Sequence, residues 1–177
     1  VNFDGITYAK GASALRQLVA WVGEREFLAG LHEYFTKHAW GNTELHDLLT
    51  ELEVTSGRDL SRWTREWLQT SGVNLLRPHV DVDADGAYTS VRIEQEPPLA
   101  PTGIEPTLRS HRVAIGLYDV TDAQLLLRER VEVDVTGAST DVPELIGNAR
   151  ADLLLVNDGD LTFAKVRLDE NSWATAT

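Results

Sequence analysis

Apolar residues in the first 72 positions recur at intervals of three and four, which is the period of an amphipathic helix. Four such stripes follow one another and end at Gly23, Gly41, Gly57 and Gly72, and glycine often ends a helix. We therefore predict four helices of similar length. Their apolar positions are Tyr8, Ala12, Leu15, Val19 and Val22; Phe27, Leu28, Leu31, Tyr34 and Phe35; Leu45, Leu48, Leu49 and Leu52; and Leu60, Trp63, Trp67 and Leu68.

From His79 onward the pattern changes to short alternating or continuous apolar runs between turn residues, which is typical of strands. The dipeptide Asp85-Gly86 predicts a hairpin turn. The proline-rich segment 96–106 predicts a long connection without a strand. Six short strands with turn spacing favour an antiparallel sandwich. They are predicted around 80–82, 88–93, 111–120, 125–135, 153–156 and 161–168.

The two halves also differ in composition. All six prolines follow Gly72, whereas four of the five tryptophans precede it. The sequence therefore predicts an α+β chain with two domains. A helical bundle is expected over 1–74 and an antiparallel β-sandwich over 75–168, and 169–177 is expected to be a linker towards a further domain.

The net charge argues against some classes of binding partner, and the lack of cysteine excludes some kinds of catalytic and metal site. The 28 acidic and 16 basic residues give a net charge of −12, which argues against nucleic acid or an anionic membrane as the main partner. No cysteine is present, which excludes thiolate zinc sites and cysteine nucleophiles and suits the cytoplasm. The chain opens at Val1 without an initiator methionine or a leader, so we expect a piece of a longer protein.

The histidines do not form a metal-binding motif. Zinc peptidases carry His-Glu-x-x-His, in which the two histidines are four residues apart on one helix face. Here His32 and His38 are six apart, about 240° around a helix, so they point to different sides. His46, His79 and His111 have no carboxylate at ligand spacing, and we interpret all five histidines as structural or surface residues.

Tyr8 is the strongest candidate for chemistry. It is expected in the first turn of a helix that carries small residues at Gly11, Ala12 and Ala14. A tyrosine hydroxyl ordinarily keeps its proton at neutral pH and can donate a hydrogen bond to a developing oxyanion. The alternative from the residues alone is that Tyr8 packs in the core, because it lies on an apolar stripe.

A family resemblance favours the chemical role. The run 3–12 contains Tyr-x-Lys-Gly-Ala at residues 8–12, and it is followed by Phe-Leu-Ala-Gly-Leu at 27–31 and His-Ala-Trp-Gly-Asn-Thr at 38–43. These motifs closely resemble the aminopeptidase N family of zinc metallopeptidases. The resemblance continues through the tryptophan-containing segment 60–72 and, less specifically, to residues 155–165.

The resemblance implies the end of a thermolysin-like catalytic domain followed by a β-sandwich spacer. By it, Tyr8 is the catalytic tyrosine that stabilises the tetrahedral intermediate when zinc-bound water attacks the first peptide bond. Lys10 belongs to the motif but receives no role. The zinc ligands, the general base and the carboxylates that anchor the substrate are expected outside this chain. The whole enzyme is expected to act on peptides, and the chain alone to bind no zinc, to hydrolyse nothing and to pack against the rest of its catalytic domain.

Two other interpretations stay open. The near-regular glycine spacing also suits a non-catalytic helical scaffold joined to a β-sandwich binding module. Alternatively, an apolar stripe meant for the missing catalytic part makes the isolated chain self-associate.

Overall fold

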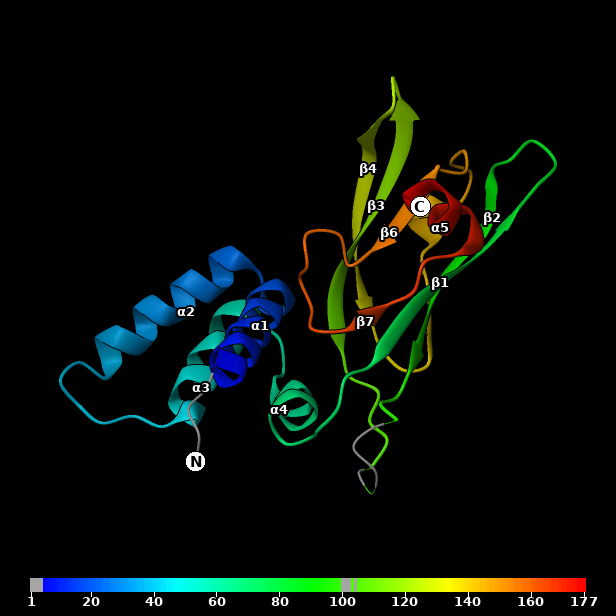
Figure 1. Cartoon of the computed structure of the whole chain (residues 1–177). Helices are drawn as coiled ribbons and strands as arrows, with labels where there is room; N and C mark the ends of the chain where they lie inside the picture. The colour runs from blue at the N-terminus through cyan, green and yellow to red at the C-terminus, as the bar shows by residue number, and fades with distance from the viewer. Residues whose placement is uncertain (1–4, 100–102, 104) are drawn as a thin grey trace. The chain divides into compact units, whose positions relative to one another are not determined.

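The computed structural model describes residues 5–99, 103 and 105–177, which divide into two compact units (Figure 1). The helical unit is Val1–Gln69, and the sandwich unit is Thr70–Thr177. Helices come first and two β-sheets follow, so the predicted α+β class is confirmed.

Four helices make up the described part of the helical unit: α1 (Gly5–Val22), α2 (Glu24–Lys37), α3 (Leu45–Ser56) and α4 (Ser61–Leu68). All four are at the expected places, but they shorten from 18 residues in α1 to 8 in α4 and are not of similar length. Gly23 separates α1 from α2 with a φ of 96°, which glycine adopts at little cost. Gly57 ends α3 in the left-handed conformation.

Gly30 lets α2 and α3 approach closely. A Cβ atom added there would lie 2.7 Å from Leu52 Cδ2 and 2.9 Å from Thr55 Oγ1. The Thr55 hydroxyl also donates a hydrogen bond of 2.9 Å to the carbonyl of Glu26. The two helices are therefore joined by a close contact that tolerates no larger side chain.

The core of the helical unit is small. It comes from α1, α3, α4 and the residue before α4, and Trp63 stacks on Trp67 with ring centroids 6.0 Å apart. Large apolar side chains stay exposed on the same unit, among them Leu15, Leu28 and Phe35. The unit thus leaves apolar surface uncovered. Its buried apolar residues are Leu18, Val22, Leu49, Leu52, Leu60 and Trp63.

Two sheets form the sandwich unit. The first has the order β5-β2-β1-β7 and the second the order β4-β3-β6. All pairs are antiparallel except β1 with β7, which is parallel. The strands are β1 (Leu75–Val82), β2 (Tyr88–Glu96), β3 (His111–Thr121), β4 (Gln124–Val135), β5 (Ser139–Asp141), β6 (Leu153–Val156) and β7 (Lys165–Val166). Asp85-Gly86 lies in the β1–β2 turn, so the predicted hairpin is confirmed.

The strands differ from the prediction at Pro78 and near the end of the chain. β1 starts at Leu75 and continues through Pro78, although proline donates no ladder hydrogen bond. It is accommodated because β7 pairs with β1 only at Leu75 and Leu76, so beyond them that side of β1 is an open edge. Within 161–168, only Lys165–Val166 forms a strand.

Apolar side chains of both sheets fill the space between them. The buried set comes from β1, β2, β3, β4, β6 and the segments that flank β6. It is about twice as large as the core of the helical unit, so the sandwich unit closes most of its own apolar surface. Its members are Leu76, Tyr88, Val91, Ile93, Val113, Ile115, Leu117, Val135, Val142, Leu145, Ala151, Leu154 and Val156.

Arg109 fixes the segment that precedes β1. Its guanidinium donates hydrogen bonds of 2.6 Å to Asn74 Oδ1, 2.7 Å to Thr70 Oγ1 and 3.1 Å to the carbonyl of Ser71. Both Arg109 and Asn74 are buried. Residues 70–74 are therefore held against the sandwich by one buried and two partly buried hydrogen bonds.

Gln95 and His111 extend this network into the sheets. Gln95 Nε2 donates to the carbonyl of Arg109 at 3.0 Å, and Gln95 Oε1 lies 3.2 Å from His111 Nε2. His111 Nδ1 lies 2.7 Å from Thr162 Oγ1. Burial, and secondly the positive charge of Arg109, lowers the pKa of His111 to about 3, so the ring is neutral at physiological pH.

Helix α5 (Glu170–Ala176) lies against β6, in the segment where we expected a linker. The N–H of Leu154 in β6 donates to Ser172 Oγ at 2.9 Å, and Asn171 Nδ2 donates to the carbonyl of Asp152 at 3.0 Å. Asp169 caps the helix by accepting from the N–H groups of Asn171 and Ser172. The outer edge of β6 is therefore covered by side chains of α5.

Candidate functional site

Tyr8 lies in the first turn of α1, as the sequence predicts, and its side chain is 70% exposed. It does not pack in the core of the helical unit, although it continues the apolar stripe of α1. Its hydroxyl has no hydrogen-bond partner among the described side chains. A ligand from outside the described residues can therefore reach this hydroxyl.

The surface next to Tyr8 is made of small residues. Gly11 and Ala12 follow Tyr8 at spacings of three and four, so they share its helix face. A Cβ atom added at Gly11 would meet nothing within 4 Å, and Ala12 is exposed. This face is open enough for another backbone to approach α1 closely.

The other end of α1 is firmly held. Gln17, Leu18 and Val22 are buried, and the last two belong to the core of the helical unit. Tyr8 is ten residues from Leu18, which corresponds to about 15 Å along a helix. The hydroxyl is thus carried on a helix that is anchored at its far end and open around its first turns.

Other parts of the Tyr8 motif contribute less. Phe3 and Asp4 lie outside the described residues. Lys10 is exposed and forms no ion pair with a carboxylate of the described residues. Among the described residues, Tyr8 and Lys10 are therefore both exposed side chains of α1.

No metal centre is found within the described residues, because no three histidine or carboxylate side chains converge there. His32 is exposed, and the ring of His38 instead lies 5.4 Å from that of Tyr34. The residues present do not fit a catalytic zinc.

A hollow of about 300 Å³ lies at the turn between α2 and α3, and the sequence analysis did not predict it. Tyr34, His38 and Trp40 line it, and the Tyr34 hydroxyl lies 2.5 Å from Thr43 Oγ1. Trp40 is fully exposed and has a φ of 65°, which is unusual for a bulky residue. These aromatic residues add to the uncovered apolar surface of the helical unit.

No helix in the described part of the chain has the length and apolar content needed to cross a bilayer. The cytoplasmic location expected from the sequence stays a prediction.

Comparisons with known proteins identify the family. Residues 1–67, which include Tyr8, match the peptidase family M1 domain. The chain is 59% identical to aminopeptidase N of Streptomyces lividans over 180 residues, which cover 100% of this chain and 21% of that protein. The chain belongs to peptidase family M1. The resemblance stated from the sequence motifs is thereby confirmed.

Other relatives are matched over shorter parts of this M1 chain. Mitochondrial aminopeptidase 2 of Saccharomyces cerevisiae is 30% identical over 132 residues, or 72% of the M1 chain and 13% of the yeast protein. Tricorn protease-interacting factor F2 of Thermoplasma volcanium is 37% identical over 94 residues, or 53% of the M1 chain and 11% of that protein. The M1 chain thus spans about a fifth or less of the length of these curated relatives.

A solved structure shares the fold. The M1 chain matches the crystal structure of Legionella pneumophila aminopeptidase A in complex with aspartic acid with a TM-score of 0.70 and 17% identity. The match covers 98% of the M1 chain and 19% of the Legionella chain. At this identity the likeness shows the fold alone.

Proposed function

We propose that this chain is one segment of a longer zinc-dependent aminopeptidase, in which Tyr8 stabilises the transition state for removal of the N-terminal residue of a peptide. The observation that carries the proposal is the position of Tyr8. It is exposed in the first turn of α1, within the residues that match the M1 domain.

The chemistry of this step suits a tyrosine hydroxyl. When a nucleophile adds to a peptide carbonyl, the oxygen gains negative charge and becomes an oxyanion. A neutral donor held about 3 Å from that oxygen stabilises the charge without first losing a proton. The anchored far end of α1 fixes the donor, and the small residues beside Tyr8 leave room for the substrate.

In this proposal the metal ligands and the general base come from outside the described residues. No group of side chains in the described part fits zinc, so the ligands are assigned to another segment of the longer protein. Zinc would supply the activated nucleophile there, and Tyr8 would supply the donor from this chain.

Tyr8→Phe in the full-length protein tests the role of the hydroxyl. We expect kcat for an aminoacyl p-nitroanilide to fall about 100- to 1000-fold with little change in KM, because the lost hydrogen bond forms only in the transition state. Tyr34→Phe is the matched control, since the Tyr34 hydroxyl bonds to Thr43 within the helical unit, and it should keep near-normal kcat. Full turnover in Tyr8→Phe would favour the scaffold interpretation instead.

The isolated chain should be inactive even when metal is supplied. Because its described residues hold no metal-binding cluster, the 177-residue chain is expected to release no amino acid from peptides above the uncatalysed rate. The measurement is a peptide hydrolysis assay with purified chain and excess Zn²⁺. Turnover that survives repeated purification would contradict the placement of the metal site elsewhere.

A further inference from the structure

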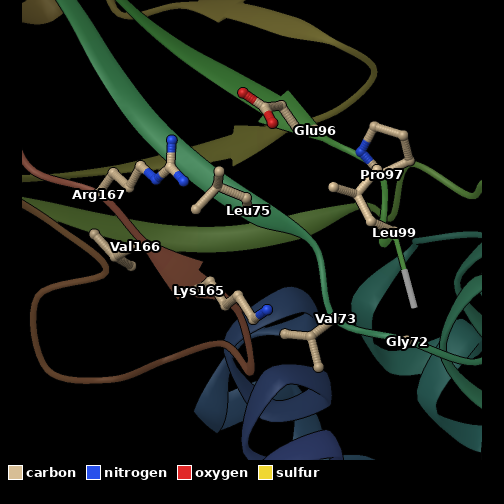
Figure 2. A pocket seen from close by; sticks show the side chains of 9 residues that line it. All are labelled: Gly72, Val73, Leu75, Glu96, Pro97, Leu99, Lys165, Val166 and Arg167. Carbon is tan, nitrogen blue, oxygen red and sulfur yellow. The ribbon is translucent and has the colours of Figure 1, made fainter. Parts of the chain in front are cut away.

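A groove of about 630 Å³ runs beside β7 on the sandwich unit (Figure 2). Its wall is mainly apolar and comes from three stretches that are far apart in sequence. The apolar lining residues are Val73, Leu75, Pro97, Leu99 and Val166. Lys165, Arg167 and Glu96 supply the charges that line it, and Figure 2 shows the two cations on one side and Glu96 on the other.

Lys165 and Arg167 are electrostatically unusual. Neither forms an ion pair with a carboxylate among the described residues, although the whole chain has a net charge of −12. Glu96 lies 3.6 Å from Arg77 and is therefore already paired. Arg109 belongs to the buried polar network, and each remaining arginine of the sandwich unit has a carboxylate within 4.0 Å: Arg77, Arg92, Arg112, Arg128, Arg130 and Arg150.

The backbone beside these cations is also unpaired. β7 is the last strand of its sheet, and the N–H groups of Lys165 and Arg167 donate to the β1 side. The N–H and C=O of Val166 therefore face outward, where no described strand lies. The edge of β6 is covered by α5, whereas this edge is open and can accept an added strand.

The side chains around β7 define what an added strand should carry. Lys165 and Arg167 are two residues apart on an extended segment, so they project to the same side. Val166 lies between them and projects to the other side. A second hollow of about 550 Å³ beside β7 is lined by Val166 and Arg167 together with Leu155, Leu168 and Trp173. A matching strand would place carboxylates at alternate positions and an apolar side chain between them.

We propose that the β7 groove binds an extended acidic segment of another polypeptide, with an acidic-apolar-acidic sequence that pairs with Val166 and contacts Lys165 and Arg167. Charge complementarity carries the proposal, because these two cations lack carboxylates in a chain that is otherwise rich in them. All the residues that line the groove belong to the sandwich unit, and the proposal does not depend on aminopeptidase activity.

The probe is the peptide Val-Glu-Val-Glu-Val-Glu-Val with an acetylated N-terminus and an amidated C-terminus. Acetylation removes the free amino group, so an aminopeptidase cannot shorten it. Binding to the full 177-residue chain is measured by calorimetry at low ionic strength. We expect saturable binding that weakens at least tenfold when glutamine replaces each glutamate of the probe or when salt is raised.

Two double variants locate the site. Lys165→Gln with Arg167→Gln should weaken binding at least tenfold. Arg112→Gln with Arg128→Gln removes the same charge from the other sheet and should change the affinity less than twofold. Circular dichroism verifies that both variants fold.

Hydrogen exchange tests the pairing mode, since the added strand should slow exchange in the peptide that contains Val166. Absence of binding to the wild-type chain, or equal weakening in both double variants, would overturn the proposal. Binding without protection at Val166 would overturn the strand-addition part.

Discussion

The sandwich unit buries more of its apolar side chains than the helical unit does. The sandwich unit encloses its apolar side chains between two sheets and covers the β6 edge with α5. The helical unit buries a much smaller set and leaves Tyr8, Phe35 and Trp40 exposed. We therefore expect the helical unit to gain stability when another segment covers this apolar surface.

Polar groups show the same contrast. In the sandwich unit, Arg109, Gln95 and His111 bond to one another or to nearby groups although they are buried. In the described part of the helical unit, the indole N–H groups of Trp21 and Trp63 are buried without an acceptor. Each such group costs about 1–3 kcal/mol, so the helical unit is the less completely satisfied of the two.

The largest effect is expected from a cavity in the sandwich core. Leu117→Ala should lower the free energy of unfolding of the sandwich unit by about 3–5 kcal/mol, because Leu117 is fully buried. Four of the five tryptophans lie in the helical unit, so fluorescence reports that unit, while hydrogen exchange reports the sandwich. If both transitions shift equally, the two units unfold as one and the comparison fails.

An intermediate effect is expected from acid. His111 has a pKa of about 3 in the folded state against 6.5 when unfolded, so the unfolded chain binds more protons below pH 6.5. The contribution of His111 to the free energy of unfolding is therefore fully present above pH 6.5 and is lost as the pH falls towards 3. Between pH 8 and 5 the loss should be about 2 kcal/mol.

The measurement is urea unfolding of the sandwich unit at both pH values. His111→Gln removes the titrating ring, so its unfolding free energy should lack this part of the pH dependence. An equal pH dependence in both proteins would assign the effect to other groups.

The smallest effect concerns the open face of α1. Gly11→Ala should stabilise the isolated chain by up to about 1 kcal/mol, because the new methyl group meets nothing and alanine favours the helix. In the full-length protein the same change should be destabilising, since another segment is expected to cover this face.

Thermal unfolding of both proteins, followed by tryptophan fluorescence, compares the two contexts. Gly30→Ala is the contrasting variant and should destabilise the isolated chain by about 1–3 kcal/mol, because its Cβ would meet Leu52 and Thr55. If Gly11→Ala is equally favourable in both contexts, nothing covers α1 near Tyr8.

Local patterns predicted most of the elements. The helical period located α1 to α4, and Asp85-Gly86 located the first hairpin, because these signals lie within a few residues of one another. The start of β1 at Leu75 was missed, since whether a strand tolerates Pro78 depends on where the neighbouring strand ends. That information is not local.

The candidate site at Tyr8 and the buried polar network were harder to predict from the sequence. The apolar stripe alone favoured a buried Tyr8, and only the Tyr-x-Lys-Gly-Ala motif pointed to a catalytic role. In the structure Tyr8 is 70% exposed and is not part of the core of the helical unit, which the apolar stripe does not reveal. Arg109, Gln95 and His111 could not be grouped either, because their partners come from distant parts of the chain.

Helix α5 also matters for protein engineering. Ser172 occupies the position that a further strand would take beside Leu154. A recombinant sandwich that ends before residue 170 would therefore expose the unpaired backbone groups of an edge strand, which favours fibril growth and domain swapping. Anyone who wishes to use this sandwich as a stand-alone module should retain its last helix.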